Sequence, residues 1–166
     1  MTEIHAEAGA LRSDDDRCAV RFRRLYDFTP DELWSALTDP AQLTRWLARA
    51  QVDPGVGGHV SLDFDGGSTE GGRILVWDEP SVLEYEWRFS DEEPSVVRFE
   101  LHPQEAGTLL VLDHRQLGRS SGAGYGAGWH AHLDALGRVY AFTDEAWTRR
   151  FEELLPEYTA QADELG

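Results

Sequence analysis

A helical pattern at residues 125–140 constrains the fold more than any other segment of the chain. Four large apolar residues recur at helical spacing and so share one stripe: Trp129, Leu133, Leu136 and Tyr140. Asp134 and Arg138 lie on the opposite face, spaced as a favourable ion pair on a wet side of the helix. Because the segments before this helix have the pattern of strands, its apolar stripe must be buried against a sheet.

Alternation of apolar and polar residues predicts strands through most of the chain before this helix. About six strands are expected, over residues 17–28, 59–65, 70–77, 83–89, 97–101 and 108–115. Short turns separate the later strands, so they form an antiparallel meander. Arg24 interrupts the apolar face of the first strand. We expect its charged head to reach water at the rim, whereas an inward position would indicate a ligand.

Two short helices are predicted directly after the first strand. Thr29 is followed by Pro30 and by Glu32, the arrangement of an N-cap, a first helical proline and a capping box. Asp39 and Pro40 repeat the cap and the proline, so they begin a second short helix.

A further helix is predicted near the end of the chain. Thr143 has the character of a new N-cap, and the helix after it is expected to stop before Pro156. The apolar stripes on the two sides of Thr143 stay in phase, so one continuous helix is the alternative. We favour the break.

Residues 1–16 differ from the rest of the chain. They are rich in acids, contain few large apolar groups and show no periodicity, which predicts a disordered acidic tail. A single domain is therefore expected over residues 17–160, with a core at 17–142 and an extra terminal helix at 143–160.

The composition limits the partners. The formal net charge is −16, which argues against nucleic acid and anionic membranes, because phosphate binding requires cationic side chains. Cys18 is the only cysteine, so neither an intramolecular disulfide nor a cysteine-based zinc site can form. With no long apolar run and no secretion leader, we expect a cytoplasmic protein that does not contact membranes.

The histidines do not have the spacing of a metal site. His130 and His132 lie two residues apart on the predicted helix, which separates them by about 160° around its axis. His59, His102 and His114 fall on different strands. Zinc needs three or four converging ligands, so no metal and no cofactor is predicted.

Two histidines remain candidates for a polar role in a cavity. His132 flanks the buried stripe and is either a hydrogen-bonded boundary residue, a contact for a ligand carbonyl or phenol, or a general acid/base. For Asp113 and His114 the alternation leaves open which one points inward, since the residues before them are apolar on both faces. No catalytic residue is assigned.

The order of the elements resembles the helix-grip fold of the START-like superfamily, also called SRPBCC or birch-pollen-allergen-like. Short motifs resemble the branch related to the activator of the heat-shock-protein-90 ATPase: Phe28-Thr29-Pro30, Leu33-Trp34-Ser35-Ala36-Leu37-Thr38-Asp39-Pro40, Leu43-x-x-Trp46, Val56-Gly57-Gly58, Asp78-Glu79-Pro80 and Gly128-Trp129-x-x-x-Leu133-Asp134-x-Leu136. The resemblance implies an α+β protein in which a curved antiparallel sheet grips the long helix, often with an apolar cavity between them. It implies no invariant catalytic motif.

Three functions are compatible with this resemblance, whose superfamily includes binders of lipids, hormones, pigments and polyketides as well as cyclases and aromatases. The first is binding of a small lipophilic or aromatic molecule, with no catalysis assigned. The second is a cyclase or aromatase that uses His132 or His114 as acid/base. The third is a co-chaperone-like domain with a protein partner, and a homodimer also stays open. Cavity candidates for the first are Phe64, Tyr85, Trp87, Phe99, Trp129, His132, Leu133 and Leu136.

Overall fold

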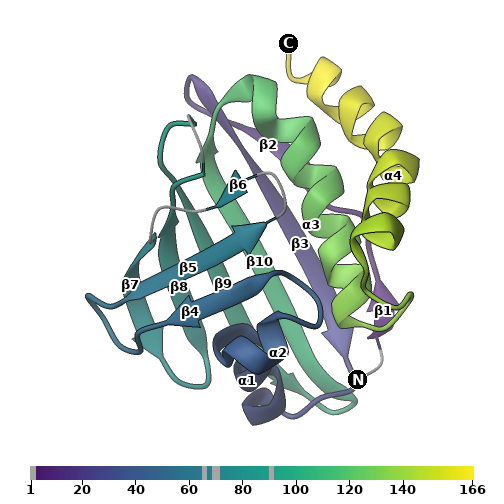
Figure 1. Cartoon of the computed structure of the whole chain (residues 1–166). Helices are drawn as coiled ribbons and strands as arrows, with labels where there is room; N and C mark the ends of the chain where they lie inside the picture. The colour runs from purple at the N-terminus through teal and green to yellow at the C-terminus, as the bar shows by residue number, and fades with distance from the viewer. Residues whose placement is uncertain (1–2, 65–66, 69–71, 90–91) are drawn as a thin grey trace.

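A curved antiparallel sheet surrounds one long helix in the computed structural model, which describes residues 3–64, 67–68, 72–89 and 92–166 (Figure 1). The strands are β1 (Glu3–Ala6), β2 (Ala10–Asp14), β3 (Arg17–Tyr26), β4 (Arg49–Val52), β5 (His59–Phe64), β6 (Gly67–Ser68), β7 (Gly72–Asp78), β8 (Val82–Trp87), β9 (Ser95–Gln104) and β10 (Gly107–Leu117). The helices are α1 (Pro30–Thr38), α2 (Pro40–Leu43), α3 (Gly122–Leu136) and α4 (Asp144–Glu164), and a 3-10 turn, η1 (Arg119–Ser121), leads into α3.

The strand order is β1-β3-β10-β9-β8-β7-β5-β4, with β2 also paired to β3 and β6 to β5. Every pairing is antiparallel, and Figure 1 shows α3 lying across the sheet with α4 on its outer side. The predicted helix-grip fold is therefore confirmed. The described strands exceed the expected number because β1, β2, β4 and β6 are only two to five residues long, too short for a pattern that marks them in the sequence.

Both predicted helix starts after β3 are confirmed. The Thr29 hydroxyl accepts a hydrogen bond from the Glu32 backbone N–H at 3.1 Å, and the Glu32 carboxylate accepts one from the Thr29 N–H at 2.9 Å. This is the complete capping box. Asp39 caps α2 through the Ala41 N–H at 3.0 Å. These hydrogen bonds join residues two or three positions apart and do not depend on distant segments, so they could be predicted without the tertiary structure.

The expectation of a disordered tail is wrong for residues 10–14, which form β2 against β3. The segment before β2 is also held by α4. The Gly9 N–H donates to the Tyr158 hydroxyl at 2.7 Å, and Gln161 bonds to both Gly9 and Leu11. Backbone pairing and two side chains from the far end of the chain order this acidic segment, and neither requires an apolar pattern.

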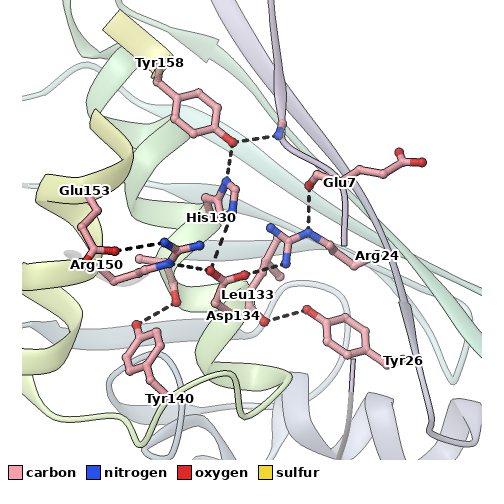
Figure 2. Close-up of polar contacts among 12 residues, drawn as sticks. Glu7, Arg24, Tyr26, His130, Leu133, Asp134, Tyr140, Arg150, Glu153 and Tyr158 are labelled. Carbon is pink, nitrogen blue, oxygen red and sulfur yellow. Dashed lines mark hydrogen bonds and ion pairs between the residues drawn. The ribbon is translucent and has the colours of Figure 1, made fainter. Parts of the chain in front are cut away.

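Arg24 lies inside the protein, so the expected position at a wet rim is wrong. Its side chain has no exposed surface, and its guanidinium donates to the Asp134 carboxylate at 2.9 Å and to the Glu7 carbonyl at 3.0 Å (Figure 2). Asp134 is buried as well and also accepts from Arg150 of α4 at 2.8 Å. The predicted wet face of α3 is therefore wrong too, because β3 and α4 cover it.

The break near Thr143 is confirmed, since α3 ends at Leu136 and the Thr143 hydroxyl caps α4 at Ala146. The predicted helix end at Tyr140 is therefore wrong by one turn. The expected stop before Pro156 is wrong as well, because α4 continues to Glu164. Pro156 and Glu152 are both exposed, so water can bind the Glu152 carbonyl that loses its helical partner.

Candidate functional site

A cavity of about 750 Å³ lies between α3, α4 and the sheet. One face of α3 contributes five lining residues at helical spacing, and Ser121 at its N-cap continues this face: Gly124, Tyr125, Gly128, Trp129 and His132. Aromatic rings face them from the sheet side and from residues 142–151, which include the first turns of α4: Phe64, Trp87, Phe89, Phe142, Trp147 and Phe151. The volume lies within the range of ordinary small-molecule sites.

Two glycines keep this space open. Gly124 and Gly128 lie in the middle of the lining face of α3, one turn apart. A Cβ atom at Gly124 would meet nothing within 4 Å, and one at Gly128 would meet only the Trp147 ring, at 3.7 Å. Glycine inside a helix costs about 0.5–1 kcal/mol relative to alanine. The two glycines therefore lower the stability of the helix and enlarge the cavity. No close contact with a neighbouring element requires a glycine at either position.

Gly126, between them, has the opposite role. A Cβ there would lie 2.4 Å from the Tyr158 ring, so this glycine lets α3 and α4 approach each other. We predict that Gly126→Ala destabilises the protein by about 1–3 kcal/mol through overpacking. Gly128→Ala should instead stabilise it by about 0.5–1 kcal/mol. Urea unfolding of both variants checks this, and a shift of the same sign in both would contradict the contrast.

The wall of the cavity is a continuous group of aromatic rings. Ring centroids are 6.0 Å apart for Phe64 and Trp87 and 5.4 Å apart for Trp87 and Trp129. On the α4 side, Trp147 stacks on Phe151 at 5.1 Å. Such rings offer a large rigid apolar surface to a ligand at little entropic cost.

His132 brings a polar atom to this aromatic wall. Its ring lies 5.1 Å from Trp147 and 6.1 Å from both Phe64 and Trp129. The side chain is buried, and its Nδ1 lies 2.9 Å from the Trp46 carbonyl oxygen. Burial lowers the pKa of His132 to about 4, so the ring is neutral near pH 7.

His114, not Asp113, points inward, which answers the question that the alternation left open. The Trp129 indole N–H donates to its Nδ1 at 2.9 Å, and its Nε2 can then donate to the Ser95 hydroxyl at 2.7 Å. Burial lowers the pKa of His114 to about 3. Both ring nitrogens are occupied and the ring does not line the cavity, so His114 cannot act there as acid or base.

A polar group lies at the exposed side of the cavity. The Tyr125 hydroxyl accepts from the Trp87 indole N–H at 3.0 Å and donates to the Glu92 carboxylate. Burial, together with this carboxylate, raises the pKa of Tyr125, so the phenol stays protonated. The contact fixes the two aromatic side chains relative to each other.

The structure divides the predicted cavity residues into two groups. Phe64, Trp87, Trp129 and His132 line the cavity. The other four are packed core residues that do not reach it: Tyr85, Phe99, Leu133 and Leu136. Sequence reasoning missed Gly124, Gly128 and the rings from the later segments. The glycines did carry a signal, because they fall in the helical stripe of Tyr125, Trp129 and His132.

His130 lies on the opposite side of α3 from the cavity, as the helical spacing required. Its Nδ1 is 2.8 Å from the Tyr158 hydroxyl, and its Nε2 is 3.7 Å from the Asp134 carboxylate (Figure 2). Burial is the largest cause that lowers the pKa of His130 to about 4. This ring belongs to the polar network that joins α3, α4 and β3, and no three metal-ligating side chains converge among the described residues.

The buried histidines predict a dependence of stability on pH. In the unfolded chain each imidazole protonates at about its ordinary pKa of 6.5, whereas the folded values for His114 and His132 are about 3 and about 4. Below about pH 6.5 the unfolded state therefore binds more protons than the folded state. The histidine contribution to the free energy of unfolding is fully present above about pH 6.5 and is lost as the pH falls toward about 4. Each of these rings contributes a slope of up to about 1.4 kcal/mol per pH unit, and so does His130, whose folded pKa is also about 4. Urea unfolding between about pH 7 and about pH 5 measures it, and a constant free energy of unfolding would contradict neutral buried rings.

A curved antiparallel sheet that closes over one long helix, with an aromatic cavity between them, defines the helix-grip class of proteins. Within this class, residues 27–141 match the family described as "Activator of Hsp90 ATPase homolog 1-like protein". The chain belongs to this family, which is part of the START-like (SRPBCC) superfamily. The matched region begins after β3 and ends before α4, so β1, β2, β3 and α4 lie outside it.

Solved structures share the fold over most of this chain. CalU16 from Micromonospora echinospora is 29% identical, with a TM-score of 0.75 over 96% of this chain and 99% of that chain. A conserved protein of unknown function from Enterococcus faecalis, EF2215, is 20% identical and has a TM-score of 0.76 over 95% and 92%. DynU16 is 26% identical, with a TM-score of 0.68 over 75% of this chain and 47% of that chain. No curated protein matches the chain.

The fold family commonly binds small lipophilic ligands and includes cyclase-type proteins. Among the described residues, no helix is both long and apolar enough to span a bilayer.

Proposed function

We propose that this protein binds a small, largely apolar aromatic molecule in the cavity between α3 and the sheet. The observation that carries the proposal is an aromatic-lined space of about 750 Å³ that Gly124 and Gly128 leave unfilled. A close-packed core would be more stable with side chains at these positions, so the open space is best explained by a ligand.

The comparisons support a small-molecule ligand. DynU16 is described as a putative protein in the dynemicin biosynthetic locus. A fold shared with a protein from a biosynthetic locus favours a role in binding such a product or one of its precursors. The acidic surface, with its net charge of −16, disfavours anionic ligands.

A cyclase-type activity has less support. His132 has a pKa of about 4, which makes it a weak general base near neutral pH. His114 has no free ring nitrogen. The alternatives of a co-chaperone-like role, a protein partner and a homodimer remain predictions. None of the contacts described above favours one of them.

Titration with pyrene tests the proposal, because this neutral probe has no hydrogen-bonding group and its emission reports an apolar environment. We expect saturable binding of a single pyrene per chain, quenching of tryptophan fluorescence and an increased melting temperature. Absence of saturable binding by pyrene and by smaller aromatic hydrocarbons would reject the function.

A further inference from the structure

The orientation and protonation of His132 are set from behind the cavity. Its Nδ1 lies 2.9 Å from the Trp46 carbonyl oxygen, which can only accept a hydrogen bond. Nδ1 must therefore carry the proton. Since burial keeps the ring neutral, Nε2 has no proton and is a hydrogen-bond acceptor.

No described residue donates a hydrogen bond to this nitrogen, although the side chain is only 7% exposed and lines the cavity. The neighbouring Phe64 and Phe142 rings have no polar hydrogen to offer, and the N–H of Trp129 is already bonded to His114. Nε2 is not itself sealed off, so a bound ligand without a donor would bury this acceptor unpaired, whereas a ligand that carries a donor would satisfy it.

Trp147 adds a second unsatisfied group on the same wall. Its indole N–H is buried and has no hydrogen-bond partner among the described residues, and its ring lies 5.1 Å from that of His132. An acceptor and a donor thus lie on neighbouring rings. A ligand hydroxyl reaches the acceptor directly, whereas it would meet the buried Trp147 N–H only after a shift of the indole ring.

We propose that the cavity selects hydroxylated aromatic molecules, such as phenols and fused-ring aryl alcohols, whose hydroxyl group donates a hydrogen bond to Nε2 of His132. This inference rests on the proposed ligand-binding function and adds the polar group that the ligand must carry. A ketone, an ether or a quinone oxygen has no proton to donate and would place a lone pair against that of Nε2. A carboxylate would add the burial of a charge beside an unprotonated ring.

The test compares naphthol with methoxynaphthalene substituted at the same position, since the two differ mainly in the donor proton. Isothermal titration calorimetry of the intact protein should show naphthol binding about ten-fold more tightly, the size expected when a buried acceptor is left unpaired. On naphthol binding, the nitrogen NMR signal of His132 Nε2 should move from that of a bare ring nitrogen toward that of a hydrogen-bonded one.

Two variants distinguish the role of the Nε2 acceptor from that of the hydrogen bond between Nδ1 and the Trp46 carbonyl. In His132→Asn the amide N–H can keep the contact with the Trp46 carbonyl, but no acceptor reaches the Nε2 position. In this variant the ratio of the naphthol affinity to the methoxynaphthalene affinity should fall to about one. In His132→Gln the amide lies near the Nε2 position and the Trp46 contact is lost, so part of the preference should return. A merely structural role for His132 would give the reverse order.

The possible outcomes are distinct. If pyrene, naphthol and methoxynaphthalene all fail to bind the parent protein, the ligand-binding function and this inference both fail. If the two naphthalenes bind equally and His132→Asn changes neither affinity, the inference fails while the function stands.

Discussion

Replacing Asp134 by alanine is expected to destabilise the protein by about 3–5 kcal/mol, the largest loss we predict for a single substitution away from the cavity. The exposed fractions of the Arg24 and Asp134 side chains are 0% and 3%, so the variant would leave a guanidinium charge sealed in the interior. Arg150 would lose its partner on α3 at the same time. Urea unfolding of the variant measures the loss.

The chain offers a matched control on β2 and β10, two strands that pair with β3. Arg12 and Asp113 also form an arginine–aspartate pair at 3.0 Å, but their side chains are 44% and 22% exposed. Asp113→Ala should therefore cost at most about 1 kcal/mol. The double variant Arg24→Met with Asp134→Leu, which removes both charges, should recover much of the stability lost in Asp134→Ala. Equal losses for Asp134→Ala and Asp113→Ala would show that the Arg24 charge is not sealed.

Filling the cavity from α3 is expected to abolish ligand binding without unfolding the protein. In Gly128→Phe a benzyl group would extend from the centre of the lining face into the space between Trp147 and the sheet. Since even one methylene in an apolar pocket changes affinity about 10-fold or more, the ring should weaken pyrene binding by about a hundred-fold. The pyrene titration measures this directly.

Gly128→Ala is the control, because its methyl group meets Trp147 only at ordinary contact distance. It should bind pyrene almost as the parent protein does. Gly128→Phe should also unfold at a urea concentration no lower than the parent, since it replaces a helical glycine. Full pyrene binding by a folded Gly128→Phe variant would place the ligand elsewhere.

The candidate site was only partly predictable because its residues differ in what determines their position. Phe64, Trp87 and Trp129 could be found, since alternation and helical spacing indicate which way such side chains point. Tyr85 and Phe99 have the same pattern, yet they are covered by the rings around Trp129. The periodicity of the sequence distinguishes inward-facing residues from outward-facing ones. It does not distinguish an inward side chain that is packed in the core from one that lines a cavity.

His132 shows the same limit at the level of chemistry. The helical spacing placed it beside the buried stripe, but its proton position depends on the carbonyl of Trp46, which is distant in sequence. A histidine at such a position can contact a ligand carbonyl or a ligand phenol, and the choice between the two requires knowing which ring nitrogen carries the proton.

Features that depend on neighbours along the chain could be predicted from the order of the residues: the capping box at Thr29, the caps at Asp39 and Thr143, and the alternation of the long strands. Their hydrogen bonds and periodicities form within a few residues. Three features became evident only in the folded chain: the burial of Arg24, the strand at residues 10–14 and the continuation of α4 through Pro156. Arg24 is buried because Asp134 supplies a counter-charge, and residues 10–14 form a strand because β3 supplies an edge for pairing. The helix α4 continues because Pro156 lies on its exposed side, and only folding determines which side is exposed.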